Sequence, residues 1–323
     1  MKITKDMWDE ELRPLYGSLS FVRQLVKRRW TLSIIDFLTR RFLIGKPIEG
    51  VLTSEHKVSS RDDGHKIRVN VHRPDGSSPG ETLPLMLYIH GGGYITGIPE
   101  IFNESIKCFI DTRPCVVVAP DYRKAYTKPY PTALNDCYDT LHWAIENANQ
   151  IGVDPTKIMV VGTSAGGGLT AALSLKARDA GEYKIAFQMP IYPMIDDQQP
   201  DDPERHMHSP GWDSELNRIG WSAYLADLHR TGEDIPPDAA PMRCSDYAGL
   251  PPTITLVGTL EPFYWETVRY VDQLSKAGVA VAFREFDKCF HGFDFAAGET
   301  KIGKEALDFT YSNYADYYDR YVA

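Results

Sequence analysis

The pentapeptide Gly-Thr-Ser-Ala-Gly at residues 162–166 constrains the fold more than any other part of the chain. It directly follows the apolar run at residues 157–161 and leads into residues 169–178, which favour a helix. A sharp turn from a strand to a helix exposes a serine hydroxyl, and flanking glycines leave room for the strained backbone. The pattern predicts a strand, a tight turn and a helix, with Ser164 as candidate nucleophile. A glycine-rich turn without chemistry is the alternative.

Apolar runs alternate with helical segments along most of the chain. This alternation predicts an α/β fold in which helices cover both faces of a mostly parallel sheet. The expected strands are residues 66–73, 83–89, 115–120, 157–161, 184–189, 253–257 and 279–286. Open α/β sheets build their sites beyond the carboxyl ends of the strands, so residues that directly follow these runs are the first candidates for a site.

Three consecutive glycines follow His90 at the end of the run 83–89. Such a segment can turn its N–H groups inward, as stabilisation of a tetrahedral oxyanion requires. Gly91 and Gly92 are the expected donors, and the amide of Ala165 at the start of the next helix would be the third. A phosphate loop is the alternative, but the spacing fits neither G-x-G-x-x-G nor G-x-x-x-x-G-K-[ST]. Tyr94, directly after the glycines, is a candidate substrate contact.

An acid and a base follow Ser164 in the chain order that this turn predicts. Glu261 lies just beyond the run 253–257, and His291 lies in a short loop beyond the run 279–286. The imidazole would take the serine proton and return it to the leaving group, while the carboxylate fixes the tautomer.

Other acids compete with Glu261 for this role. Glu266, Asp287 and Asp294 also lie near Glu261 or His291 in the sequence. Glu261 is favoured because it follows a strand directly, whereas Glu266 would lie one turn into a helix.

Two further features have simpler interpretations. His206 and His208 lie in a polar loop rich in Asp, and we interpret them as solvated because no third metal ligand has suitable spacing. Cys289 is interpreted as a packing residue, since Ser164 has the better context for a nucleophile. We therefore predict no metal and no cofactor.

Together these motifs resemble the hormone-sensitive-lipase-like esterases, bacterial family IV of the α/β-hydrolase superfamily. The matching segments are residues 90–93, 121–123, 130–137, 162–167, 240–243, 250–252 and 290–293. Thr163 is typical of the G-T-S-A-G branch of this family. The resemblance implies an oxyanion loop at residues 90–93 and a triad of Ser164, His291 and Glu261, with Glu where the family often has Asp.

The resemblance also implies an activity. A chain of this family would hydrolyse carboxylic esters of short to medium acyl length through an acyl-enzyme, and the small-molecule ester would be its main partner. A deacetylase or amidase with the same triad stays open, as does a receptor for small molecules on the same fold. His291 speaks against the receptor, because the imidazole is present.

Two regions depart from the alternation and define the expected domains. Residues 1–45 form an amphipathic, helix-like lead, and residues 195–243 form an insertion between two strands. In the family these regions pair as a helical cap, and the hydrolase core then comprises residues 46–194 and 244–323. Basic residues in the lead suggest a membrane surface, but we favour a cap helix with a solvated charged face.

Composition excludes some partners. The 323 residues include 35 Lys and Arg against 44 Asp and Glu, so the net charge of −9 argues against nucleic acid. No apolar run has the length of a membrane span, and the start of the chain lacks the pattern of a secretory signal. Five cysteines at irregular spacings indicate reduced thiols. We expect a cytoplasmic protein without stable membrane insertion, and a homodimer paired through a sheet edge is plausible.

Overall fold

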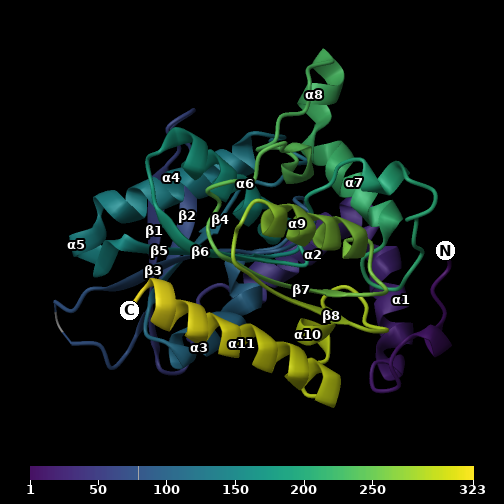
Figure 1. Ribbon diagram of the computed structural model, residues 1–323, viewed down its shortest axis with the longest axis horizontal. Helices are drawn as coiled ribbons and strands as arrows, with labels where there is room; N and C mark the ends of the chain where they lie inside the picture. The colour runs from purple at the N-terminus through teal and green to yellow at the C-terminus, as the bar shows by residue number, and fades with distance from the viewer. Residues whose placement is uncertain (79) are drawn as a thin grey trace.

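A twisted sheet organises the computed structural model, which describes residues 1–78 and 80–323 and has eight strands in that part of the chain (Figure 1). The strands are β1 Val51–Ser59, β2 Lys66–Pro74, β3 Leu83–Ile89, β4 Val116–Asp121, β5 Val153–Thr163, β6 Ile185–Ile191, β7 Thr253–Gly258 and β8 Val281–Phe286. Their order across the sheet is β1-β2-β4-β3-β5-β6-β7-β8, with β2 antiparallel to both neighbours and all other pairs parallel. The predicted fold class is confirmed.

All seven predicted strands are present, but β1 was missed. Six of its nine positions are exposed, and the sequence Leu-Thr-Ser-Glu-His-Lys at residues 52–57 has no apolar run. The strand forms because it pairs along its whole length with β2, from Val51 opposite Pro74 to Ser59 opposite Lys66. Such a polar edge strand is stabilised by pairing rather than by burial, so hydrophobic periodicity does not reveal it.

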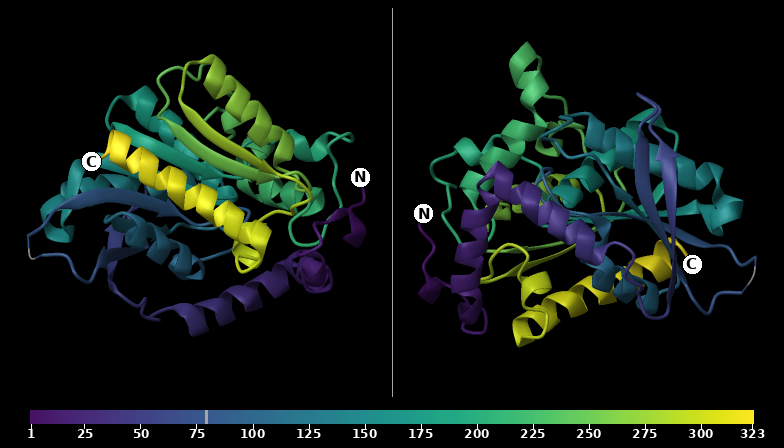
Figure 2. Two further views of the ribbon diagram at one scale, coloured as in Figure 1. Left: turned by 60° about the horizontal axis from the view of Figure 1, so that its bottom comes forward. Right: turned by 180° about the vertical axis from the view of Figure 1, so that it is seen from behind.

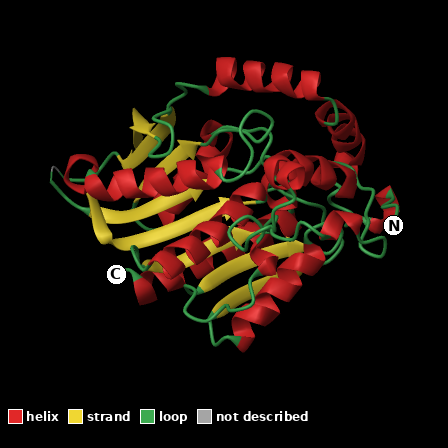
Figure 3. Cartoon of the chain, turned by 90° about the horizontal axis from the view of Figure 1, so that it is seen from above, coloured by secondary structure: helices red, strands yellow, loops and turns green. Residues whose placement is uncertain are grey.

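Helices cover both faces of the sheet (Figures 1 and 3). Their bounds are α1 Tyr16–Val26, α2 Arg29–Leu43, α3 Asn103–Thr112, α4 Thr132–Glu146, α5 Ala148–Ile151, α6 Ala165–Ala180, α7 Ser214–Tyr224, α8 Ala226–Thr231, α9 Tyr264–Lys276, α10 Phe293–Ala296 and α11 Lys301–Tyr321. Short 3-10 helices lie at Lys5–Met7, Arg13–Leu15, Pro99–Phe102, Gln199–Asp201 and Pro241–Arg243. Helices α4 and α6 pack on one face with Leu85 and Leu87 of β3, whereas α3 and α11 pack on the other with Met86 and Tyr88. Alternate residues of the central strands therefore face separate cores.

The N-terminal segment and the insertion lie side by side at one end of the molecule (Figure 2). The amide of His208 donates to the carbonyl of Met1 at 2.9 Å, and the amide of Gly211 donates to the carbonyl of Leu19 at 3.2 Å. Arg23 of α1 binds the buried Asp213 at the start of α7, with Nε 2.7 Å from Oδ2. These contacts join the two regions that we expected to pair as a cap.

The orientation of α2 differs from the prediction of a solvated charged face. Its exposed side carries large apolar side chains, including Trp30, Phe37 and Phe42, each more than 60% exposed. Asp36 and Arg40 instead turn towards the body of the protein, where Arg40 binds Asp121. The helix is amphipathic as predicted, but the ion pair between the half-buried Arg40 and the buried Asp121 places its polar side against the core. Among the described residues, no helix combines the length and apolar character needed to cross a membrane.

The turn between β5 and α6 depends on the absence of side chains at two positions. A Cβ at Gly162 would lie 2.3 Å from the carbonyl oxygen of Gly166, and a Cβ at Gly166 would lie 2.0 Å from that of Ile89. Ser164 between them has φ 58° and ψ −122°, a conformation that costs free energy in any residue with a side chain. The first turn of α6 is thereby held against the end of β3.

We expect Gly166→Ala to destabilise the protein by on the order of 1–3 kcal/mol, because the added methyl group meets the rigid backbone of β3. Gly17→Ala in α1 is the matched control, since a Cβ there meets nothing within 4 Å and should stabilise the helix by up to about 1 kcal/mol. Urea unfolding of both variants measures the difference. Equal midpoints for the two variants would contradict the close packing at Gly166.

Candidate active site

Three side chains from separate loops meet at the carboxyl edge of the sheet. Ser164 follows β5, Glu261 follows β7, and His291 follows β8. His291 Nε2 lies 2.9 Å from Ser164 Oγ, and His291 Nδ1 forms a hydrogen bond with Glu261 Oε2. The structure thus brings together the three residues that the sequence predicted.

Hydrogen bonding indicates which tautomer of His291 is present. Glu261 is fully buried, and its other oxygen accepts a hydrogen bond from the amide of Gly258 at 2.8 Å. Since an ionised carboxylate only accepts, the proton of the imidazole lies on Nδ1. Nε2 is then free to accept the hydroxyl proton of Ser164, which is the arrangement that a general base requires.

The glycine loop and the first turn of α6 lie next to the same serine. A Cβ built on Gly91 would lie 3.3 Å from Ser164 Cβ, so the glycine loop touches the candidate nucleophile. Within the described residues, the amides of Gly91 and Gly92 donate to no acceptor. Ala165 is the first residue of α6, where the helix offers its N–H no partner. These three groups are available for an oxyanion next to Ser164.

The competing acids lie elsewhere. Glu266 is completely buried, and its Oε1 accepts a hydrogen bond from the amide of Ile195 at 2.8 Å, while burial raises its pKa well above the usual range. Asp294 accepts a hydrogen bond from Tyr192, and burial raises its pKa to about 6. Asp287 forms its side-chain hydrogen bond with Thr259 at 3.2 Å. Of the four acids, Glu261 is the one bonded to His291.

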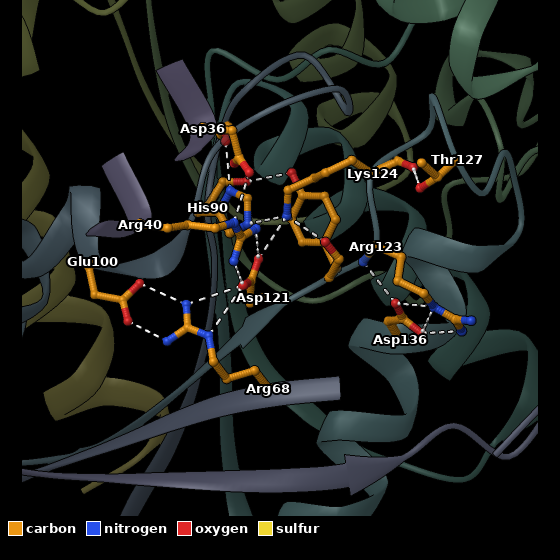
Figure 4. Close-up of polar contacts among 12 residues, drawn as sticks. Asp36, Arg40, Arg68, His90, Glu100, Asp121, Arg123, Lys124, Thr127 and Asp136 are labelled. Atoms are coloured by element: carbon orange, nitrogen blue, oxygen red, sulfur yellow. Dashed lines mark hydrogen bonds and ion pairs between the residues drawn. The ribbon is translucent and has the colours of Figure 1, made fainter. Parts of the chain in front are cut away.

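A buried ionic network lies behind the glycine loop (Figure 4). Lys124 Nζ lies 3.1 Å from both His90 Nε2 and Asp121 Oδ1. The ammonium group only donates, so His90 accepts at Nε2 and its Nδ1–H donates to the carbonyl of Gly91 at 2.7 Å. Burial lowers the pKa of His90 well below its usual range, which keeps this imidazole neutral.

Asp121 balances the charge of this network. Burial opposes its ionisation, but the charges of Lys124 and Arg40 hold its pKa below the usual range. Arg68 joins from β2 with Nη2 3.2 Å from Asp121 Oδ2 (Figure 4). Lys124 and Arg68 were not among the residues predicted from the sequence. The available signal was a charged residue directly after an apolar strand, at Asp121, which requires partners when it is buried.

Two aromatic rings hold the imidazole of His291, and neither was predicted. The ring centroids of Tyr192 and Phe263 lie 4.9 and 4.8 Å from that of His291, both edge to face. Tyr192 directly follows β6, so its position at the carboxyl edge was the signal that could have identified it.

Tyr94 is buried between the core and the insertion. It is 1% exposed, its hydroxyl donates to the carbonyl of Met194 at 2.8 Å, and its ring stacks on Tyr224 at 4.1 Å. These contacts give Tyr94 a structural role, and its contact with substrate stays a prediction. Trp212 of the insertion instead covers the glycine loop, because a Cβ at Gly93 would lie 1.9 Å from its ring.

The remaining candidates have structural explanations. His208, Asp213 and Glu215 are close enough to hold a metal ion, but Arg23 binds both carboxylates and Lys27 binds Glu215. Cys289 is fully buried, and burial raises the pKa of its thiol. Neither feature adds a reactive group to the site.

Comparison with known proteins places the chain in a family. Residues 86–295 match the family described as having an alpha/beta hydrolase fold. Esterase LipI of Mycobacterium tuberculosis is 32% identical over 228 residues, 70% of each chain, and ethyl acetate hydrolase of Pseudomonas putida is 28% identical over 254 residues, 78% of each chain. The structure of a bacterial heroin esterase matches with a TM-score of 0.84 at 27% identity, covering 99% of this chain and 100% of that one. The chain therefore belongs to the alpha/beta hydrolase fold family, in its hormone-sensitive-lipase-like group of carboxylesterases.

Proposed function

We propose that this carboxylesterase works through a Ser-His-Glu triad and an acyl-enzyme on Ser164. The hydrogen-bonded chain from Ser164 through His291 to Glu261 is the observation that carries the proposal. A hydroxyl becomes a nucleophile when a neighbouring base takes its proton as it attacks, and His291 Nε2 is placed to do so. Glu261 stabilises the imidazolium that results.

The reaction proceeds in two halves. Ser164 Oγ attacks the ester carbonyl carbon, and the proton passes to His291 as the tetrahedral oxyanion forms. The amides of Gly91, Gly92 and Ala165 stabilise that oxyanion; His291 then protonates the departing alcohol as its bond to the acyl carbon breaks. Water attacks the acyl-enzyme with His291 as base again, which releases the carboxylic acid and restores Ser164.

The substrates proposed are esters with short to medium acyl chains. The similar protein of Pseudomonas putida is named for the hydrolysis of ethyl acetate, a small ester. Ser164 is only 8% exposed, and Trp212 packs on the glycine loop beside it. A site covered in this way limits the acyl group while it excludes water from the reacting atoms.

Replacing Ser164 by Ala should lower kcat on p-nitrophenyl acetate by about a million-fold, the scale seen when a triad serine is lost. A fluorophosphonate should add one phosphonyl group to Ser164 of the wild-type protein, located by peptide mass spectrometry, and none to the variant. Labelling of another residue, or retained turnover in the variant, would overturn the assignment of Ser164.

Glu261→Gln should reduce kcat by roughly ten-thousand-fold, because the amide no longer fixes the reactive tautomer of His291. Glu266→Gln is the matched control. Burial favours the protonated form of Glu266, which Gln resembles, and the amide oxygen can still accept from Ile195. We expect this control to keep kcat within a few-fold of wild type. The reverse ranking of the two variants would assign the acid to Glu266.

A panel of p-nitrophenyl esters from acetyl to palmitoyl, together with an anilide and an acetylated sugar, tests the substrate class. We expect kcat/KM to be highest among the short and medium acyl esters and to fall for the longest chains, which the covered site does not accommodate. Preference for the anilide or the sugar would favour the amidase or deacetylase alternative. Turnover that equals that of Ser164→Ala on every compound would favour a receptor.

A further inference from the structure

Helix α2 presents its apolar side to solvent. Its exposed apolar residues recur every three or four positions, as they do on one face of a helix. Together with two neighbours on α1, they are between 44% and 66% exposed: Phe21, Val22, Trp30, Ile34, Phe37, Leu38 and Phe42. We call this set the α1–α2 face. A helix packed on a protein core normally has the reverse arrangement, so the face needs a partner outside the described chain.

The polar side of α2 holds this orientation in place. Arg29, Ser33, Asp36 and Arg40 line a cleft of about 470 Å³ between the helix and the core. Arg40 Nη1 binds Asp121 Oδ2 at 2.5 Å, and Arg29 Nη2 donates to the carbonyl of Tyr126 at 3.3 Å (Figure 4 shows the Arg40 contact). Turning α2 to bury its apolar side would break these contacts, and the buried carboxylate of Asp121 would lose its ion pair with Arg40.

Basic side chains flank the α1–α2 face. Arg28, Arg41 and Lys46 are exposed, and none has an acidic partner among the described residues. Residues 16–47 include seven basic residues and one acidic residue, although the whole protein has a net charge of −9. Arg23, Lys27 and Arg40 pair with acidic side chains, so the rim consists of the exposed basic residues outside these pairs. A positive rim around an apolar helix face is complementary to a layer with anionic groups at its surface and apolar chains beneath them.

We propose that the α1–α2 face docks on an anionic lipid surface. The rings of Trp30, Phe37 and Phe42 enter the boundary between headgroups and acyl chains, while Arg28 and Arg41 meet the anionic headgroups. A second copy of the chain fits less well, because a two-fold contact through α2 would place the same basic rim on both sides. The docking is peripheral and involves neither Ser164 nor the remainder of the triad, so it stands independently of the proposed mechanism.

Co-sedimentation of the full-length protein with vesicles tests the proposal. We expect binding to vesicles of phosphatidylserine and phosphatidylcholine, little binding to phosphatidylcholine alone, and weaker binding as salt is raised. Phe37→Ser/Phe42→Ser should weaken the partition coefficient by roughly ten-fold or more, and Arg28→Glu/Arg41→Glu should do the same. The Ser164→Ala variant should bind like wild type, which separates this result from the outcome for catalysis.

Matched controls place similar changes away from the face. Leu52 on β1 is 55% exposed and Arg230 on α8 has a 73% exposed side chain, so Leu52→Ser/Arg230→Glu should keep wild-type binding. The surface variants on α1–α2, β1 and α8 should keep the wild-type rate on p-nitrophenyl acetate, which shows that the fold is intact. The proposal is overturned if wild type ignores anionic vesicles or if the Phe37 and Phe42 variant binds normally. It is also overturned if gel filtration shows a wild-type dimer that this variant dissociates.

Discussion

The close approach of α6 to the end of β3 is the constraint on which the site depends. Because Gly166 has no side chain, the first turn of α6 lies against the carbonyl oxygens of Ile89 and His90, where a Cβ would come within 2.0 and 2.6 Å. The turn that strains Ser164 and the loop that carries Gly91 and Gly92 are thereby one packed unit. Preorganised donors stabilise charge only if they do not have to move during the reaction. The missing side chain at Gly166 is therefore required for the packing that joins Ser164 to the glycine loop.

The sequence predicted the parts of the structure that follow from local rules. Strands β3, β4, β6 and β7 are buried on both faces and have continuous apolar runs in the sequence, which made them recognisable. The ends of the predicted parallel strands then placed Ser164, Glu261 and His291 at one edge. The order of these residues along the chain and the spacing of the glycines can be recognised from the sequence alone. The polar strand β1 was missed because its stability comes from pairing with β2. Its own residues contain no signal of that partner.

Local sequence patterns could not predict how helices and side chains are oriented relative to the core. The period of apolar residues in α2 shows that the helix has two sides, but which side faces the core depends on Asp121, about 80 positions later in the chain. Tyr94 illustrates the same limit, since its position after the glycines does not reveal which residues it packs against. The stacking of its ring on Tyr224 and its hydrogen bond to Met194 involve residues far along the chain. Long-range pairs of this kind decide orientation, and a single sequence does not reveal them.

Asp121 connects the glycine loop to the periphery. It binds Lys124, which fixes His90 at the start of that loop, and it also binds Arg40 on α2. A buried carboxylate that loses one of its cationic partners remains costly in free energy, so these ion pairs depend on one another. The insertion contacts the same loop from another side, where Trp212 packs on Gly93. The glycine loop is therefore positioned by α6, by the ionic network and by the insertion. A change in the insertion at Trp212 would therefore act on the glycine loop directly, whereas the hydrogen bonds among Ser164, His291 and Glu261 involve no residue of the insertion.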